Sequence, residues 1–438
     1  MVGSLLSAEQ RQSIAAIKDT STNQVIKRCA LILLSYDDGL ATRQIAGLVQ
    51  LSPSQVRRRR RQFCLKGMQI FPLENISEDI SLSFSEQEFP EFVIVDEPEN
   101  PQEQILLSPY SLENFIADAA LHKSPGIERN DTLAEAARKI LRFQFAQMLL
   151  KEEGTRLGED IEALHDMRVA TRRMRAALDI FNDSFTPKTI KILFKGLRQT
   201  GRRLGRVRDQ DVFIDNARRY LLTLPEEQRQ GLNPLIANWE DARQNYRQDM
   251  LAHLNSKAYR EFKENFLVFV NTPGAGVRTQ TNGILTPRLV REIAPQLIYS
   301  CLADVRAFEP IIDTATLPQF HALRIAFKKF RYAIEFFQEV LGQEVRQVIN
   351  DLKKIQDHLG ELNDAQVATL ILRDYLGEWD IQQQSIPVVQ RSSPEPVMAY
   401  LSAVYARRQT LMDTFRPTWE HFNRPEFRQN LGAAVAAL

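Results

Sequence analysis

The sequence predicts an all-α protein in which two similar helical halves follow a small N-terminal helix-turn-helix domain. From about residue 131 onward, apolar residues recur at helical spacing in long stretches, and no alternating pattern is strong enough to predict a sheet. A two-part motif occurs twice in this region at a nearly constant separation, which indicates an internal duplication. Near the N-terminus, two short helical stretches precede a run of arginines, which is the outline of a helix-turn-helix.

The N-terminal domain, residues 1–72, has the pattern of three short helices. Residues 23–36 are apolar at helical spacing and are followed by an Asp-Asp-Gly turn signal, and residues 42–49 give a second helix. A third helix is predicted to begin at the Ser-Pro-Ser-Gln start signal, with Val56 on its buried side. The arginines of this helix that are expected to point outward are Arg57, Arg58 and Arg61.

Residues 73–130 are predicted to be an acidic linker between two basic bodies. Residues 73–122 carry 12 acidic residues and no lysine or arginine. The net charge is +7 over residues 1–72 (11 basic, 4 acidic) and +6 over residues 123–438 (45 basic, 39 acidic). Because its charge is opposite to that of both neighbours, we hypothesise that the linker competes with a polyanionic ligand for a basic surface.

The helical body, residues 131–438, is divided by several predicted breaks. The widest break, residues 271–287, is rich in Gly, Thr and Pro, and is predicted to be the seam between halves of about 131–270 and 288–438. The other breaks are expected near residues 154–160, 182–187, 222–234 and 379–396.

The duplicated motif begins with a histidine and is rich in basic residues. His165 begins the stretch HDMRVATRRMR and His321 begins HALRIAFKKFR, so a histidine and four basic positions repeat at an offset of 156 residues. A second match follows at an offset of 155, where LGRVRD, ending at Asp209, corresponds to LGELND, ending at Asp364. Two linked motifs in the same order indicate that the whole module is duplicated.

Helical geometry places the histidine and most basic residues of each motif on one face, with apolar residues opposite. A solvated charged face is the usual explanation of a charge run. A stripe of one sign that includes a histidine and occurs twice instead favours an anionic ligand, which would offset the repulsion between the cations. The predicted stripes are His165, Arg168, Arg172 and Arg175 in the first half and His321, Arg324, Lys328 and Arg331 in the second, with Arg173 and Lys329 to one side.

The helix that follows each motif adds further cations. In the first half they recur on one face at Lys195, Arg198, Arg202 and Arg206. In the second half only Lys353 and Lys354 clearly correspond, and Asp357 stands opposite Arg202. We therefore expect the two halves to bind an anion unequally.

Together these motifs resemble the two halves of the CHAD domain, the histidine-bearing α-helical domain that binds polyphosphate. The resemblance covers about residues 131–435 and implies two helical bundles related by pseudo-two-fold symmetry, with the stripes lining a central basic cavity that holds inorganic polyphosphate. By motif match, it carries the binding role to the stripe residues and, less directly, to Arg173, Lys329, Arg198, Arg202 and Lys353. CHAD domains often accompany a CYTH triphosphatase domain with an ExExK motif. No such motif occurs in this sequence, so we expect binding without hydrolysis.

The sequence does not predict a metal site or a cofactor. The two histidines have no second ligand at i+3 or i+4, so a hydrogen bond to phosphate is the preferred role of their rings. Asp209, Asp211 and Asp364 could hold a hydrolytic magnesium ion. Because a helix is expected to end near these aspartates, their preferred role is to cap the next helix or to orient Arg208. A phosphohydrolase or an accessory subunit of polyphosphate or triphosphate metabolism is the alternative function.

The basic N-terminal domain suggests a second partner. Its outward arginines are predicted to contact DNA phosphates, with occupation by the acidic linker or by polyphosphate as the alternative. The whole chain would then be a tether between polyphosphate granules and the chromosome, or a polyphosphate-responsive regulator. Scattered cysteines, a polar N-terminus and the lack of a long apolar run predict a cytoplasmic protein, at granules or the nucleoid, with no membrane partner.

Overall fold

The structure is a computed structural model that describes residues 8–20, 24–38, 40, 42–49, 56, 111–278, 288–384, 386–387 and 391–438. The chain divides into two compact units, residues 1–83 and residues 84–438, and each is taken by itself. Within the described ranges there is no β-strand, only two isolated bridges between single residues. No described helix is long and apolar enough to span a membrane. The predicted all-α class is confirmed.

The N-terminal unit begins with three helices: α1 (Ala8–Thr20), α2 (Gln24–Asp37) and α3 (Thr42–Val49). Helices α2 and α3 occupy the ranges expected from the sequence. Helix α1 was not predicted, because its polar sequence has only a narrow apolar face; Ile14 on that face is fully buried against α2. Two small apolar clusters, rather than one core, hold the three helices together.

The predicted third helix of this unit falls almost wholly outside the described residues. Val56, which is described, is fully buried and packs with Ile45 and Val49, as expected for its apolar side. Arg57, Arg58 and Arg61 lie outside the described residues. The helix-turn-helix and its contact with DNA therefore remain predictions.

The second unit consists of two successive sets of helices. Its first half contains α5 (Leu112–Ala120), α6 (Leu133–Leu150), α7 (Glu152–Leu157), α8 (Ile161–Ile180), α9 (Pro187–Leu222), α10 (Asn233–Asn255) and α11 (Lys257–Asn271), with short 3₁₀ helices η2 (Asn182–Ser184) and η3 (Glu226–Leu232). Its second half contains α12 (Val290–Arg306), η4 (Glu309–Thr314), α13 (Leu317–Phe336), α14 (Val345–Gln384), α15 (Glu395–Asp413), α16 (Phe415–Phe422) and α17 (Pro425–Ala436).

The predicted breaks are mostly where the helices end. Helix α11 ends at Asn271 and α12 begins at Val290, which places the widest gap at the expected seam. Helix α14 continues to Gln384, past the predicted start of its break at residue 379. Residues 73–130, expected to be a linker, include α5, whose Phe115 is buried against Phe145 at a ring separation of 5.6 Å. The rest of that acidic stretch before residue 111 lies outside the described residues.

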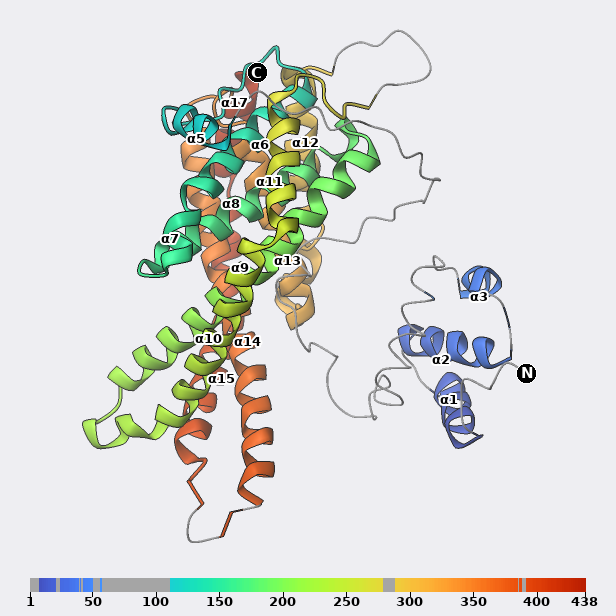
Figure 1. Cartoon of the computed structure of the whole chain (residues 1–438), viewed down its shortest axis with the longest axis vertical. Coiled ribbons are helices and arrows are strands. Elements are labelled where there is room, and N and C mark those ends of the chain that lie inside the picture. The colour runs from blue at the N-terminus through green and yellow to red at the C-terminus, as the bar shows by residue number, and fades with distance from the viewer. Residues whose placement is uncertain are drawn as a thin grey trace. The chain divides into compact units, whose positions relative to one another are not determined.

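Two apolar clusters stabilise the second unit. The larger one contains residues of both halves, and Phe181 of the first half meets Phe336 and Phe337 of the second at ring separations of 6.0 and 5.7 Å. The smaller one joins the ends of α9, η3 and α10 to α14 and α15, with Tyr220 and Tyr400 at 4.7 Å. These long helices extend beyond the main body (Figure 1). Both clusters hold the halves against each other and so fix how their basic helices meet.

Candidate anion-binding site

Helix α8 carries the first basic stripe. Its N-cap is Asp160, whose carboxylate accepts a hydrogen bond from the backbone N–H of Glu162 at 2.8 Å. Met167, Met174 and Leu178 are fully buried, so the apolar side of the helix faces the core as predicted. The opposite side keeps His165, Arg168 and Arg172 half-exposed.

Helix α13 carries the second stripe in the same way. Thr316 and Gln319 form a capping box at its start, in which the backbone N–H of Thr316 donates to the Gln319 side chain at 2.8 Å. Phe330, Ala333 and Ile334 are fully buried behind the stripe. The half-exposed residues on the other side are His321, Arg324 and Lys328.

The two basic helices contact each other directly, although their motifs are 156 residues apart in the chain. The Nε of Arg172 donates to the hydroxyl of Tyr332 at 2.8 Å, and Arg173 forms an ion pair with Glu335 at 2.8 Å. On the other side of the contact, burial raises the pKa of Asp179, and the nearby Lys329 opposes this rise. Arg173 and Lys329, the residues beside the stripes, thus lie near an acid of the opposite half.

Cations of both halves gather around Asp364 of α14. Loss of water around its carboxyl raises the pKa of Asp364, and the neighbouring charges of Arg324, Lys328 and Arg168 oppose the rise. Arg168 also lies 3.5 Å from Asp209 of α9. We call Arg168, Arg172, Arg324 and Lys328 the central cluster; two of them come from each half.

The two motif histidines have different neighbours. The Nδ1 of His321 is 3.0 Å from the Oδ1 of Asn363. Partial burial lowers the pKa of His165, and the nearby positive charge of Arg208 lowers it further. A neutral imidazole next to cations can accept a proton when a polyanion arrives, because the anion stabilises the charged ring.

Two stripe residues are placed differently from the others. Arg175 is only 6% exposed, with its guanidinium 5.8 Å from the centre of the Phe194 ring. Arg331 lies 3.4 Å from Glu335 and is close to the Tyr332 ring. Both are therefore held mainly by protein groups, beneath the more exposed members of their stripes.

The cations of the supporting helices differ in burial and in their partners. Arg198 and Arg202 are half-buried on α9, whereas Arg206 is 3.9 Å from Asp249 and lies over the Tyr246 ring of α10. Lys354 is 3.4 Å from Asp351, one turn away on α14. The exposed remaining members are Lys195 and Lys353.

The aspartates near the second motif do not cap a helix. Helix α9 runs without interruption from Pro187 to Leu222, so the expected helix end near Asp209 is wrong. The glycines of the motif are accommodated inside long helices and do not mark their ends. Asp211 is buried and accepts a hydrogen bond from Arg243 at 2.5 Å, so these carboxylates position cations.

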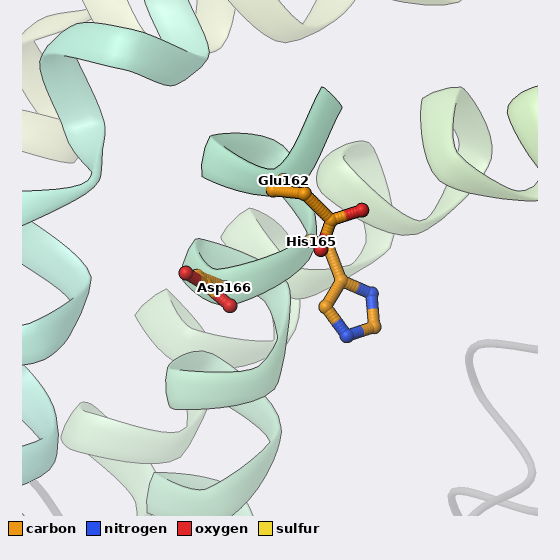
Figure 2. Close-up of side chains that lie close together, drawn as sticks. All are labelled: Glu162, His165 and Asp166. Atoms are coloured by element: carbon orange, nitrogen blue, oxygen red, sulfur yellow. The ribbon is translucent and has the colours of Figure 1, made fainter. Parts of the chain in front are cut away.

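The sequence did not predict one group of possible metal ligands. Ligand atoms of Glu162, His165 and Asp166 lie within 4.8 Å of one another (Figure 2). The missed signal was a carboxylate one turn before the histidine, not after it. Asp166 is already paired with Lys151 at 2.9 Å, and the nearby Arg208 would repel a metal ion. The positive charges of Lys151 and Arg208 therefore oppose metal binding at this group.

Comparison with known proteins identifies the family and the fold of the second unit. The family model described as "CHAD domain" matches residues 139–373. A crystal structure of the CHAD domain from the plant Ricinus communis is 24% identical over 67% of this chain and 93% of its own, with a TM-score of 0.51, which shows a common fold. PptA from Streptomyces chartreusis is 15% identical over 66% of this chain and 100% of its own, with a TM-score of 0.47. No curated protein matches the sequence significantly.

Proposed function

The chain belongs to the CHAD domain family, and from that membership and the central cluster we propose that it binds inorganic polyphosphate without hydrolysing it. The observation that carries the proposal is that Arg168 of the first half and Arg324 and Lys328 of the second lie near one carboxyl, that of Asp364, while Arg172 reaches across the contact to Tyr332. Cations brought this close repel one another, and a bound anion would reduce that repulsion. A linear polyanion would bridge them through charge-assisted hydrogen bonds, which are among the strongest polar contacts.

The decisive test reverses one charge in each half. The double variant Arg172→Glu with Lys328→Glu should weaken polyphosphate binding by roughly 100-fold or more, because two attractive contacts become repulsive. Binding is measured by isothermal titration calorimetry, and circular dichroism reports whether the helices remain folded. The neutral pair Arg172→Gln with Lys328→Gln should give a smaller loss and protects the test against misfolding.

A matched control separates the site from the general field of the protein. Arg260 and Arg428 are exposed and lie outside the candidate site, so Arg260→Glu with Arg428→Glu changes the net charge by the same amount. This control should weaken binding only slightly. If both double variants lose affinity equally, or if the site variant binds as the wild type does, the central cluster is not the binding site.

The alternative is a phosphohydrolase or an accessory subunit of polyphosphate or triphosphate metabolism. It is motivated by Asp209 and Asp364, which lie among the cations. Their contacts with Arg168, Arg324 and Lys328 favour positioning of those cations instead. Purified protein incubated with Mg²⁺ and short or long polyphosphate should release no phosphate; sustained release that is lost on Asp364→Asn would establish the alternative.

The N-terminal unit completes the proposal. Its net charge of +7 over residues 1–72 and the three outward arginines predicted from the sequence support contact with DNA phosphates. We propose a cytoplasmic protein that either tethers polyphosphate granules to the chromosome or regulates transcription in response to polyphosphate. A regulator gives a sequence-specific footprint that changes when polyphosphate is added, whereas a tether binds DNA without one.

A further inference from the structure

A groove lies near the central cluster, between α6, the end of α13 and the start of α14. It has a volume of about 780 Å³. Its charged lining residues are Lys123, Arg173, Arg346, Lys353, Glu335 and Glu339. With four basic and two acidic residues, the lining has a net charge of +2, so its overall character is cationic.

The two acids of this groove are already occupied. Glu339 accepts hydrogen bonds from the backbone N–H groups of Gly126 at 3.1 Å and Ile127 at 2.9 Å. Glu335 pairs with Arg173 at 2.8 Å and with Arg331 at 3.4 Å. Both carboxylates of the groove are therefore paired with other protein groups and do not neutralise its remaining cations.

Three cations of the groove remain available to a ligand. Lys123, Arg346 and Lys353 are exposed and have no ion-pair partner among the residues that the structure describes. The groove between α9 and α10 is different. It is lined by four arginines and four acids, and three of those arginines pair with acids of the same groove. Most of the positive charge of that groove is therefore paired within it, unlike the charges of Lys123, Arg346 and Lys353.

The groove shares its two stripe-bearing helices, α8 and α13, with the central cluster. Arg173 lines it and follows Arg172 directly in α8, and Glu335 joins Arg173 to Arg331 of the second stripe. Lys353 lies on the same face of α14 as Asp364, 11 residues earlier, which is about 16 Å at the rise of an α-helix. Arg346 extends that face by about 10 Å more. A ligand that occupies both places must be long and carry charge along its length.

We propose that this groove is an extension of the polyphosphate site, in which Lys123, Arg346 and Lys353 bind the continuing segment of a long chain. The inference rests on the proposed function and adds selectivity for chain length. A triphosphate fills the central cluster alone, whereas a long linear polyphosphate also reaches the groove. Each additional phosphate contact releases bound counterions, so affinity for long chains depends more steeply on salt.

The test compares sodium triphosphate with long-chain inorganic polyphosphate of defined length. In the double variant Lys123→Gln with Arg346→Gln, affinity for the long chain should fall by roughly fivefold or more. The plot of log affinity against log salt concentration should become less steep by about 1.4, the loss expected for two phosphate contacts. Affinity for triphosphate should stay within about twofold of the wild type. The control Arg260→Gln with Arg428→Gln removes two exposed cations elsewhere and should leave both affinities nearly unchanged.

The outcomes are distinct. If the groove variant binds the long chain as tightly as the wild type, the groove is not part of the site. If it loses affinity for both ligands in equal proportion, or if the control loses as much, the effect is one of overall charge and the inference fails. If the wild type binds neither ligand, the proposed function itself is wrong.

Discussion

One residue difference between the repeats gives the two histidines different neighbours. Position 208 is arginine in the first half, whereas the matching position 363 is asparagine. His165 therefore has a cation nearby, and partial burial together with that charge lowers its pKa. His321 has an amide oxygen 3.0 Å from its ring instead. The histidines of the two stripes thus have different neighbours, and the supporting helices of the two halves carry different numbers of cations.

The environment of His165 predicts that polyphosphate binding takes up a proton. A bound polyanion stabilises the imidazolium and raises the pKa of His165 from its lowered free-state value. The sign follows from linkage: the bound state holds more protons, so affinity should increase as pH falls through the bound-state pKa and level off below the free-state pKa. The gain is about tenfold for each unit by which binding raises the pKa.

Calorimetry in two buffers of different ionisation enthalpy measures this proton uptake directly. His165→Gln should remove most of the protein's contribution. Titration of the ligand's own terminal phosphates is common to all variants and cancels in the comparison. If His165→Gln retains the full proton uptake, the imidazole of His165 is not linked to binding.

At the scale of residues, the sequence predicted the two stripes but not the partners of each cation. Helical periodicity correctly placed Met174 and Phe330 on the buried sides. It could not show that Arg175 is covered by α9, because that depends on how two helices pack. The contact of Arg173 with Glu335 could have been predicted from the repeat. Asp179 and Glu335 are also 156 residues apart, and each lies near a basic residue of the opposite half, Lys329 and Arg173 respectively.

At the scale of elements, the long helices α9 and α14 were harder to predict than the short ones. A helix was expected to end near Asp209, yet α9 continues for more than a turn beyond it. A glycine inside a helix is tolerated where a neighbouring element approaches closely. Gly196 of α9 is such a position, because a Cβ atom there would collide with the ring of Phe262 on α11. This contact between α9 and α11 depends on packing, which the sequence does not show.

Two glycine substitutions with opposite expected effects test this explanation. Gly196→Ala should lower the free energy of unfolding by about 1–3 kcal/mol, because the added methyl group overpacks a buried contact. Gly377→Ala, in the exposed part of α14 where a Cβ meets nothing within 4 Å, should raise it by up to about 1 kcal/mol through helix propensity. Urea unfolding monitored by circular dichroism gives both values. An increase for Gly196→Ala would show that α11 can move away from α9 without cost.

At the scale of the whole second unit, the duplication is visible in the sequence but the shared core is not. The seam at residues 271–287 suggested two bundles, about 131–270 and 288–438. In the structure, a single apolar cluster runs through both halves, and Phe181 packs on Phe336 and Phe337 across the division. Sequence similarity identifies repeats, whereas side-chain packing determines whether they fold separately. Because the cationic site takes residues from both halves, the shared core also fixes its geometry.

The shared core predicts that neither half is stable alone. Residues 111–278 or 288–438 expressed separately would expose the large aromatic surface that the other half covers, so each should lack a cooperative urea transition and should not bind polyphosphate. A protease site inserted between residues 278 and 288 provides the complementary experiment on the intact chain. After cleavage under native conditions, the two pieces should remain associated on gel filtration and keep cooperative unfolding, because the buried contacts rather than the connection hold them together. A single half that unfolds cooperatively would mean that the repeats are independent bundles and that the cationic site is a contact between two preformed surfaces.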